Sequence, residues 1–386
     1  MATTWRAMSP SNRARPPDLA GGAHDQRISV SMLLDNHYGP DARVAFEIGL
    51  LRDAGISAKI VAWDRRANPA QTSGGLNDDL VRFAVPAPSG GGWHTLLALA
   101  RFGARVWRNR RALFEGTSLL MVHDIYLLPL GWALARDLDL PLIYDAHEEF
   151  RRSEARRYPT FVLRLAAAAE SRLARRAAMV VVPGSCRTSR WRGVIERPPI
   201  VVPNFGHREQ APASDALPRW DLFYAGTISD VRRLDLLVEL ARRRPDIEIA
   251  IAGDGHGAAV IEQASADLPN LTYLGWQEHV DGLFELTRSV YYGLDPSHSY
   301  SEVACPNTLY QALRHRKPLV FFCGGEPAEV ASEFTIGIRC APSVTALVQA
   351  VDEVLASSDW QFDTAWRALW DRADLSEFAE AIASAA

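Results

Sequence analysis

The stretch from Ser301 to Val320, SEVACPNTLYQALRHRKPLV, predicts a loop, a helix and a buried strand in that order. Pro306 suits the first turn of the helix, because its missing N–H costs nothing there and its ring already fixes φ near a helical value. Apolar residues then recur at three- and four-residue spacing and predict one buried helix face: Leu309, Ala312 and Leu313. The Lys317-Pro318 pair ends the helix, and the apolar run after it predicts a strand inside a sheet.

The start of this predicted helix has the properties of an anion-binding site. The first N–H groups of a helix have no partner within the helix, and the helix dipole adds partial positive charge at that end. Glu302, just upstream, cannot help to bind phosphate, but its carboxylate can hold sugar hydroxyls. The combination indicates a sugar-nucleotide site. For Glu302 itself, a solvated loop residue without a functional role is an equally good interpretation.

Length and composition predict a soluble protein of two domains. A chain of 386 residues is too long for one ordinary core, and its 48% hydrophobic and 23% charged residues are typical of globular proteins. A net charge of −4 argues against a nucleic-acid partner, since phosphate contacts need clustered positive charge. No apolar run reaches transmembrane length, and the N-terminal residues lack the apolar core of a signal peptide. Four widely spaced cysteines predict free thiols in a reducing compartment, and we expect a cytoplasmic location: Cys186, Cys305, Cys323 and Cys340.

Strand and helix patterns alternate along most of the chain. Solidly apolar strands separated by helices predict an α/β fold with parallel, doubly wound sheets. A polar, Pro- and Ala-rich break divides the alternation into two series. We therefore predict a disordered N-terminal segment, a first domain, a linker, a second domain and C-terminal helices that pack back, with the boundaries 1–26, 27–205, 206–219, 220–357 and 358–386.

Polar residues follow the ends of several predicted strands of the first domain. His123-Asp124 ends one strand, and the run from Asp145 to Glu149 ends the next. Ligands of doubly wound sheets bind at the carboxyl ends of the strands, so His147 is a strong candidate for a functional residue. Asp124 has the alternative role of capping the helix that follows it.

Several motifs in a fixed order resemble those of GT-B glycosyltransferases, in particular the retaining family 4 type. The resemblance spans about residues 28–351, and it rests on the order and spacing of the motifs taken together. The segments that carry it are DARV from Asp41, VHDIYLLPLG from Val122, YDAHEEF from Tyr144, YAG from Tyr224 with Arg232 and LDLL from Leu234, IAGDG from Ile251, LGW from Leu274 and CPNTLYQALRHRKPLV from Cys305.

The resemblance implies a GT-B fold, with two Rossmann-like domains that face each other across a cleft. It also implies that a sugar moves from a nucleotide-diphosphate-sugar to an acceptor, with retention at the anomeric carbon. Neither a catalytic metal nor a cofactor is expected, because a cationic side chain and helix amides can offset the charge that builds on the diphosphate. We expect a small soluble acceptor, for which natural-product biosynthesis is one context.

The resemblance further implies roles for individual residues. His147 and Glu302 are the expected catalytic residues. The expected donor-binding residues lie in the second domain: Gly226, Thr227, Arg232, Gly253, Trp276, Pro306, Asn307, Thr308 and Gln311. The expected acceptor-binding residues lie in the first domain: His37, Tyr38, His123 and Asp124.

The chain departs from the family pattern at the predicted ribose site. The family has a glutamate where this chain has Gln311, and its earlier glutamate would fall on Val303, one position after Glu302. Glutamine keeps a hydrogen-bond acceptor, but the charge-assisted bond to the ribose is lost.

This departure leaves two alternatives open. One is an atypical GT-B enzyme, either a transferase to sulfur or nitrogen or a sugar-nucleotide epimerase. The other is a catalytically silent protein that binds nucleotide-sugars. Peripheral membrane contact by the Arg-rich segment 151–176 is not expected, because acidic residues interrupt its arginines and favour a solvated face.

Overall fold

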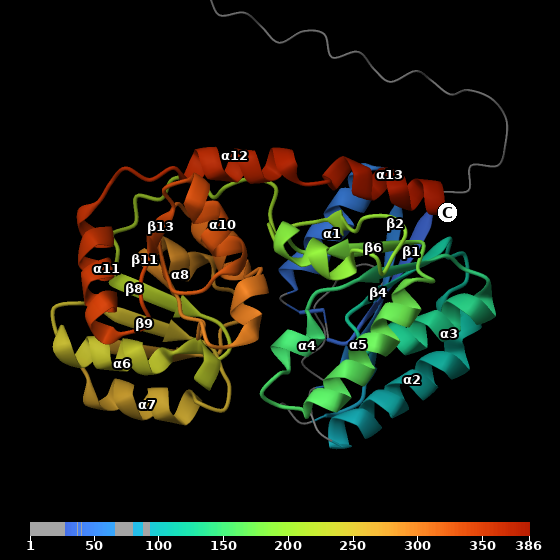
Figure 1. The fold of residues 1–386 in the computed structure, drawn as a ribbon, viewed down its shortest axis with the longest axis horizontal. Helices are drawn as coiled ribbons and strands as arrows, with labels where there is room; N and C mark the ends of the chain where they lie inside the picture. Colours follow the sequence, from blue (N-terminus) through green and yellow to red (C-terminus); the bar gives the residue numbers. More distant parts are fainter. Residues whose placement is uncertain (1–27, 37, 40, 66–79, 88–92) are drawn as a thin grey trace, which may run out of the picture.

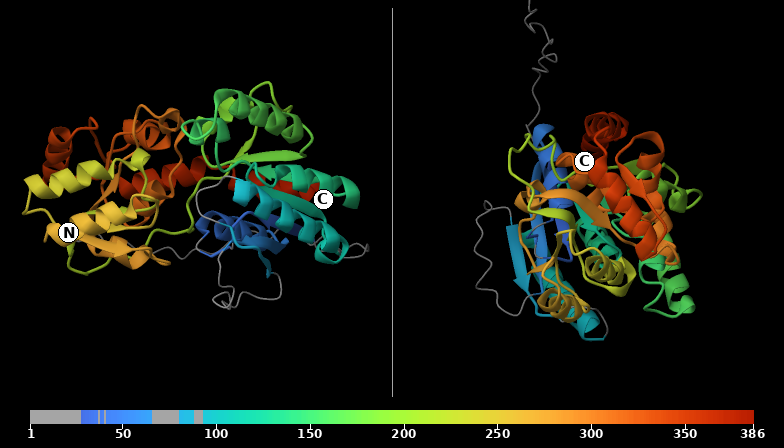
Figure 2. Two further views of the ribbon diagram at one scale, coloured as in Figure 1. Left: turned by 90° about the horizontal axis from the view of Figure 1, so that it is seen from below. Right: turned by 90° about the vertical axis from the view of Figure 1, so that its left-hand side faces the viewer.

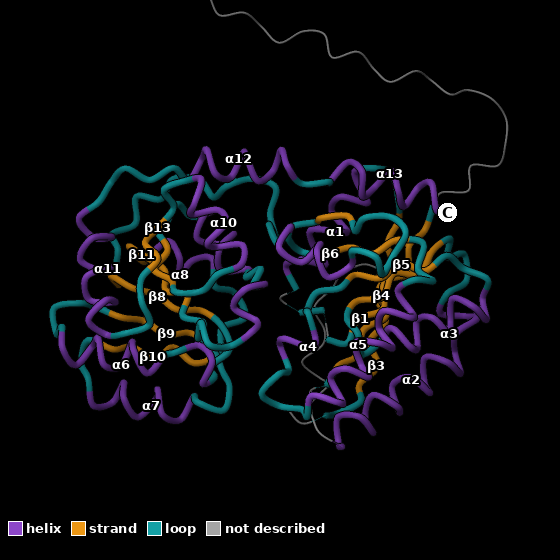
Figure 3. Tube along the Cα trace, viewed as in Figure 1, coloured by secondary structure: helices purple, strands orange, loops and turns teal. Residues whose placement is uncertain are grey.

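The computed structural model describes residues 28–36, 38–39, 41–65, 80–87 and 93–386. The described chain forms two α/β domains that lie side by side (Figure 1). Figure 3 shows the strands at the centre of each domain, with helices around them. The predicted disordered segment 1–26 and the predicted acceptor residue His37 lie outside the described residues.

The first domain contains a seven-stranded parallel sheet in the order β3-β2-β1-β4-β5-β6-β7. The strands are β1 (Ser29–Leu34), β2 (Ser57–Asp64), β3 (Leu80–Ala84), β4 (Leu119–His123), β5 (Leu142–Asp145), β6 (Met179–Val182) and β7 (Ile200–Val201). The helices that join them are α1 (Ala42–Asp53), α2 (Trp93–Leu113), α3 (Leu128–Leu138), α4 (Phe150–Ser153), α5 (Thr160–Ala174) and the 3₁₀ segment η2 (Ser185–Trp191). Strands β1 and β4 are neighbours, so the strand order reverses between them and opens a crevice at their carboxyl ends.

The second domain repeats this plan with six parallel strands in the order β10-β9-β8-β11-β12-β13. The strands are β8 (Trp220–Ala225), β9 (Ile249–Ala252), β10 (Leu271–Gly275), β11 (Thr287–Tyr292), β12 (Leu319–Phe321) and β13 (Gly337–Arg339). The helical segments are η3 (Asp230–Arg232), α6 (Leu234–Arg243), α7 (Ala258–Asp267), α8 (Asp281–Glu285), η4 (Ser299–Val303), α9 (Asn307–Arg314), α10 (Gly325–Glu333) and α11 (Val344–Ala356). Apolar side chains fill both faces of the sheet, as a doubly wound fold requires.

The last two helices cross from the second domain to the first along one edge of the molecule (Figures 1 and 2). Helix α12 (Phe362–Arg372) contacts α9, and α13 (Leu375–Ala385) contacts α1 and β7. The ring of Phe205, in the interdomain connection, lies 4.9 Å from Tyr310 and 4.8 Å from Trp366, measured between ring centroids. This aromatic cluster joins the connection to both helix α9 and the returning helix α12.

One predicted element differs from the structure. The sequence from 334 to 338 reads as a strand, whereas the structure has helix α10 before it and strand β13 only from Gly337. Phe334 is extended and ends α10, so only the last residues of the predicted strand join the sheet. None of the described helices is both long and apolar enough to cross a membrane.

Candidate active site

A cleft of about 1180 Å³ lies between the two domains, at the carboxyl ends of both sheets. Its first-domain wall includes His147 and Glu148, which follow β5. Its second-domain wall includes all nine predicted donor-binding residues: Gly226, Thr227, Arg232, Gly253, Trp276, Pro306, Asn307, Thr308 and Gln311. The fold thus brings ten of the residues singled out in the sequence to one cavity.

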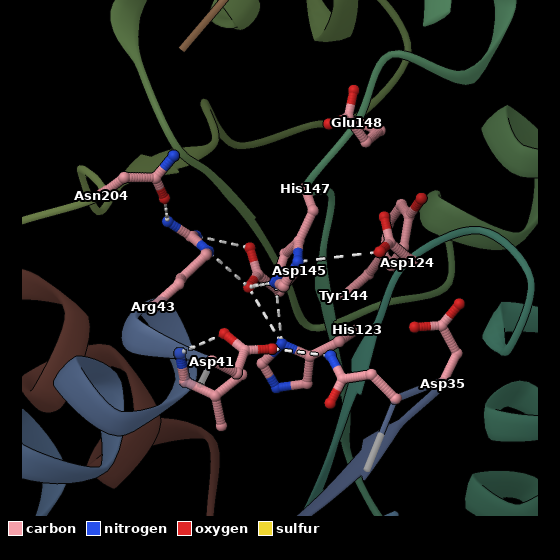
Figure 4. A network of polar contacts seen from close by, with 12 residues as sticks. Asp35, Asp41, Arg43, His123, Asp124, Tyr144, Asp145, His147, Glu148 and Asn204 are labelled. Atoms are coloured by element: carbon pink, nitrogen blue, oxygen red, sulfur yellow. Dashed lines mark hydrogen bonds and ion pairs between the residues drawn. The ribbon is translucent and has the colours of Figure 1, made fainter. Parts of the chain in front are cut away.

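His147 is held by a buried carboxylate behind it (Figure 4). Its Nε2 lies 2.5 Å from Oδ2 of Asp145, the last residue of β5. Arg43 binds both oxygens of the same carboxylate, with Nε–Oδ2 and Nη2–Oδ1 distances of 2.9 and 2.6 Å. Because Nε2 is bound to Asp145, Nδ1 is the nitrogen of His147 that can bind a ligand. The nearest carboxylate oxygen to Nδ1 in its ion pairs is Oδ2 of Asp124, at 3.7 Å.

Charge in this network favours a protonated His147. Burial opposes the charged imidazole, but the carboxylates of Asp145 and Asp124 outweigh it and raise the pKa of His147 to about 10. Burial also opposes the charged form of Asp145, yet Arg43 and His147 hold the pKa of this carboxyl well below its usual range. The pKa of Asp124 rises to about 7, mainly through burial. At neutral pH the cleft therefore presents a cationic His147 backed by an ionised Asp145.

Arg43 also links this network to the second domain. Its Nη1 donates to the side-chain oxygen of Asn204 at 3.1 Å, and Nδ2 of Asn204 donates to the carbonyl of Cys305 at 2.8 Å. Cys305 immediately precedes Pro306, the N-cap residue of α9. A chain of hydrogen bonds through Asp145, Arg43 and Asn204 therefore connects His147 to the residue before the N-cap of α9.

The N-terminus of α9 opens into the cleft. Pro306 is its extended N-cap residue, and among the described side chains none caps the helix. Because proline has no N–H, the first backbone donors are the amides of Asn307 and Thr308, which both line the cleft. These amides and the helix dipole form a site for an anion.

Arg232 supplies a positive charge to the same wall. It ends η3, after strand β8, and donates from Nη1 to the hydroxyl of Tyr292 at 2.9 Å. In the part of the chain that the structure describes, no carboxylate forms an ion pair with Arg232. Its charge is therefore available to an anion in the cleft.

The side chain of Gln311, one turn into α9, also has no hydrogen-bond partner among the described side chains.

Glycine is required where the loops after β8 and β9 meet. Gly253 has φ 146° and packs so closely that a Cβ there would lie 1.9 Å from the carbonyl oxygen of Gly226. Any side chain at Gly253 would push the two loops apart and deform the floor of the cleft. The main role of Gly253 in this structure is therefore loop packing.

The structure corrects several of the roles expected from the sequence. Glu302 lies outside the cleft, where its exposed carboxylate pairs with Nη1 of Arg152 at 2.6 Å, because η4 turns its side chain toward α4. Tyr38 packs into the first-domain core, and His123 is only 2% exposed behind His147. Neither side chain can touch an acceptor in this arrangement. Asp124 lies beside His147 but does not line the cleft.

His123 instead positions His147. Its Nδ1 lies 3.1 Å from Oδ2 of Asp145 and 3.0 Å from Nε2 of His147. Burial lowers the pKa of His123, so the ring is neutral and adds no repulsion beside the charged His147.

One group of described side chains has the spacing of metal ligands: His123, Asp145 and His147, whose ligand atoms lie within 4.8 Å of one another. Both oxygens of Asp145 already bind Arg43, and a dication at this point would lie beside the Arg43 guanidinium. Because like charges repel strongly at buried positions, these residues do not fit a metal. The expectation of metal-independent chemistry stays a prediction.

Three side chains that build the site had no role assigned to them from the sequence. Asp145 and Arg43 lie 102 residues apart, and Asn204 lies in the interdomain connection. Asp145 ends a buried strand two residues before His147, and the rule that ligands gather at strand ends marked the run from Asp145 to Glu149 but selected only His147 from it. For Arg43, the signal is a charged residue in the first turn of a helix that follows β1.

Comparison with known proteins supports the assignment of the fold. Residues 38–204 match the model of the glycosyl transferase 4-like domain. No curated protein sequence matches the chain significantly.

Three solved structures share the fold over nearly the whole chain. HepE from Anabaena, in complex with UDP and glucose, has a TM-score of 0.65 at 13% identity and covers 93% of this chain and 99% of its own. TarM from S. aureus, in a complex that contains UDP, has a TM-score of 0.67 at 10% identity, with 93% and 99% coverage. The UDP-GlcNAc 2-epimerase from Methanocaldococcus jannaschii, with UDP-GlcNAc and UDP, has a TM-score of 0.53 at 13% identity, with 89% and 99% coverage.

The fold is GT-B, as the sequence predicted, and the resemblance to GT-B glycosyltransferases is confirmed. The first domain carries the sequence match and the second supplies the anion-binding wall of the cleft.

Proposed function

We propose that the chain is a retaining, metal-independent glycosyltransferase that moves a sugar from a nucleotide-diphosphate-sugar to a small soluble acceptor. The observation that carries this proposal is the N-terminus of α9, which opens into the cleft on the same wall as the charge of Arg232. Within the described part of the chain no side chain caps this helix and no carboxylate pairs with Arg232. These two features together suit a diphosphate better than a single carboxylate. A cytoplasmic location and a place in natural-product biosynthesis are parts of the proposal.

The diphosphate is the leaving group of the reaction. When the bond between the anomeric carbon and the phosphate oxygen breaks, negative charge builds on the diphosphate. The amides of Asn307 and Thr308 and the Arg232 guanidinium offset that charge without rearranging, because the fold already holds them in place. They supply the stabilisation for which other transferases use a metal ion.

His147 occupies the opposite wall of the cleft. With Nε2 fixed by Asp145, its protonated Nδ1 can donate to a hydroxyl of the transferred sugar or to a phosphate oxygen. The acceptor enters along the first-domain wall, where Asn36, Asp41 and Glu148 offer polar groups. Gln311, with no partner among the described side chains, faces the position proposed for the ribose.

A screen of donors tests the proposal. Purified protein is titrated calorimetrically with UDP-, GDP- and dTDP-sugars, and release of the nucleoside diphosphate is followed with and without a chelator. We expect at least one donor to bind and to be hydrolysed slowly, at a rate that the chelator leaves unchanged. NMR of the product then gives the configuration at the anomeric carbon. Lack of binding to every nucleotide-sugar would overturn the proposal, and an inverted product would overturn its stereochemical part.

Epimerisation of a nucleotide-sugar is the second candidate, because the same fold occurs in the epimerase from M. jannaschii. The two activities differ in what happens to the donor alone. An epimerase converts the sugar without releasing nucleoside diphosphate and without an acceptor, whereas a transferase releases it. NMR of the donor after incubation separates the two.

A further inference from the structure

Two of the four cysteines meet at the boundary between the domains. The Sγ atoms of Cys186, in η2 of the first domain, and Cys305, before α9 in the second domain, lie 3.1 Å apart. The two residues are 119 positions apart in the sequence, and both are free thiols. The other two cysteines, Cys323 and Cys340, belong to the second domain and form no such pair among the described residues.

Neighbouring groups hold this pair in place. A Cβ at Gly184, the residue before η2, would lie 2.6 Å from Sγ of Cys305, so only glycine lets this loop approach so closely. The carbonyl of Cys305 accepts from Asn204 at 2.8 Å. The contact between the two sulfurs is therefore set by packing on both sides of the boundary.

A buried cation lies at the same boundary. Arg187, next to Cys186, is 3% exposed, and its Nε donates to the carbonyl of Val303 at 2.9 Å. Its Nη2 donates to the hydroxyl of Tyr300 at 2.8 Å. Positive charge close to a thiol favours the thiolate, which is the reactive form. Burial, the contact with Cys186 and the carboxyl of Glu326 raise the pKa of Cys305 well above its usual range, and the charge of Arg187 opposes only part of that rise, so Cys305 reacts as the thiol.

The carboxyl of Glu326 raises the pKa of Cys305 when it is charged. Burial raises the pKa of Glu326 to about 8, so this carboxyl is largely protonated at pH 7. Of the two cysteines, Cys186 is the one that is partly exposed, so an oxidant reaches it first.

We propose that Cys186 and Cys305 are a redox modification site, at which a reversible disulfide ties the first domain to the start of the donor-side helix α9. Disulfides in reducing compartments are generally transient and redox-sensing, which suits a pair placed beside a functional cleft.

The oxidant we name is hydrogen peroxide. The Cys186 thiolate attacks one peroxide oxygen, the O–O bond breaks, and Cys186 becomes a sulfenic acid while hydroxide leaves and takes up a proton to form water. The Cys305 sulfur then attacks Sγ of Cys186, the S–O bond breaks, and a second water leaves with the proton of the Cys305 thiol. In total two thiols lose two electrons and two protons, and peroxide is reduced to two waters.

The cross-link acts on the cleft because Cys305 is both a lining residue and the neighbour of Pro306. With η2 joined to Cys305, the two walls of the cleft cannot separate at this point. Enzymes that enclose a substrate between domains need that movement for binding and release. Oxidation is therefore expected to slow donor turnover, and reduction to restore it.

The chemical test uses the full chain, reduced and then treated with hydrogen peroxide. Remaining thiols are alkylated under denaturing conditions, and a non-reducing digest is analysed by mass spectrometry. We expect a linked peptide that contains Cys186 and Cys305, which reduction with dithiothreitol removes. Cys186→Ser should give no linked peptide, and Cys340→Ser, a change at a partly exposed thiol outside the pair, should give it as the wild type does. Four alkylated thiols in the treated wild type, or a link to Cys323 or Cys340 instead, would overturn the proposal.

The functional test rests on the proposed transferase activity. Peroxide should lower wild-type donor turnover by about tenfold or more, as expected when a domain movement is blocked, with recovery on reduction. Cys186→Ser should keep its turnover in peroxide. If the linked peptide forms but the variant is inhibited as strongly as the wild type, the proposed control of the cleft is wrong. If the reduced protein has no turnover at all, the proposed function fails, while the mass spectra still decide the cross-link.

Discussion

The Nε2 atom of His147 lies 2.5 Å from Oδ2 of Asp145, and both oxygens of that carboxylate are also bound by Arg43. Asp145 is fully buried, so its charge acts on His147 with little screening from solvent. The pair fixes the orientation of the ring at the wall of the cleft and keeps it protonated. In the proposed function, the charge that His147 carries at neutral pH depends on this buried carboxylate.

Replacement of Asp145 by asparagine should therefore lower the pKa of His147 from about 10 toward its ordinary value of 6.5. The ring would lose its proton within the neutral range, and turnover should fall as pH rises from 6 to 9 in the variant but not in the wild type. We expect a loss of about 10²-fold at pH 8, in the range found when one electrostatic group of an active site is removed. Histidine NMR titration and the pH dependence of turnover measure the two effects.

A matched control is Asp137→Asn, which removes a carboxylate from a surface pair with Arg110 far from the cleft. Thermal melting checks that Asp145→Asn folds, because the change leaves Arg43 with one partner fewer. A folded variant whose pH profile matches that of the wild type would contradict this account of His147.

Arg232→Ala should weaken binding of a nucleoside diphosphate by about 10- to 100-fold. A hydrogen bond to a charged group contributes about 1.5–3 kcal/mol, and about 1.4 kcal/mol corresponds to a tenfold change in affinity. Calorimetric titration with UDP, GDP and dTDP measures the change. Arg242→Ala, on the exposed face of α6, is the control and should bind as the wild type does. Equal affinities for the two variants would remove Arg232 from the proposed site.

Gln311→Glu should tighten binding of nucleotides through the ribose by about tenfold, because a carboxylate forms stronger, charge-assisted bonds with the diol. The expected gain is larger for a nucleoside diphosphate than for inorganic pyrophosphate, which has no ribose. Glu302→Ala should leave both affinities unchanged, since Glu302 lies outside the cleft and pairs with Arg152. A gain of equal size for pyrophosphate would show that Gln311 does not face the ribose.

Glu326 should make the protein less stable as pH rises. Burial raises its pKa to about 8, whereas the unfolded chain titrates near 4.5, so between these values the folded chain binds more protons. The free energy of unfolding therefore falls as pH rises from 4.5 to 8. Glu326→Gln keeps the bond with Tyr310, whose hydroxyl donates to Oε1 at 2.5 Å, and removes the charge.

Relative to the wild type, Glu326→Gln should gain about 2 kcal/mol or more between pH 5 and pH 9, since each unit of pKa shift corresponds to about 1.4 kcal/mol. Urea unfolding at several pH values gives this difference. Glu353→Gln, an exposed change on α11, should show no such trend. A difference between wild type and Glu326→Gln that does not vary with pH would show that Glu326 titrates normally.

The sequence was sufficient to predict the architecture because the signals are local. Solidly apolar strands such as β4 and β9, each followed by a helix, allow few arrangements other than parallel doubly wound sheets. The start of α9 was also predictable, since Pro306 and the apolar spacing after it are features of consecutive residues.

The site was only partly predictable because its polar contacts join distant residues. Nothing local indicates that Arg43 meets Asp145, or that Cys186 meets Cys305. The direction in which a side chain on a short loop points cannot be predicted from the local sequence either. The ion pair with Arg152 that turns Glu302 away from the cleft exists only once α4 and η4 are packed together.

The proposed donor site is tested best by a crystal structure of the protein with UDP, or with whichever nucleoside diphosphate binds most tightly. We expect the diphosphate to contact the amides of Asn307 and Thr308 and the guanidinium of Arg232, with the ribose against Gln311. A nucleotide bound elsewhere, or one whose phosphates point away from the N-terminus of α9, would contradict it.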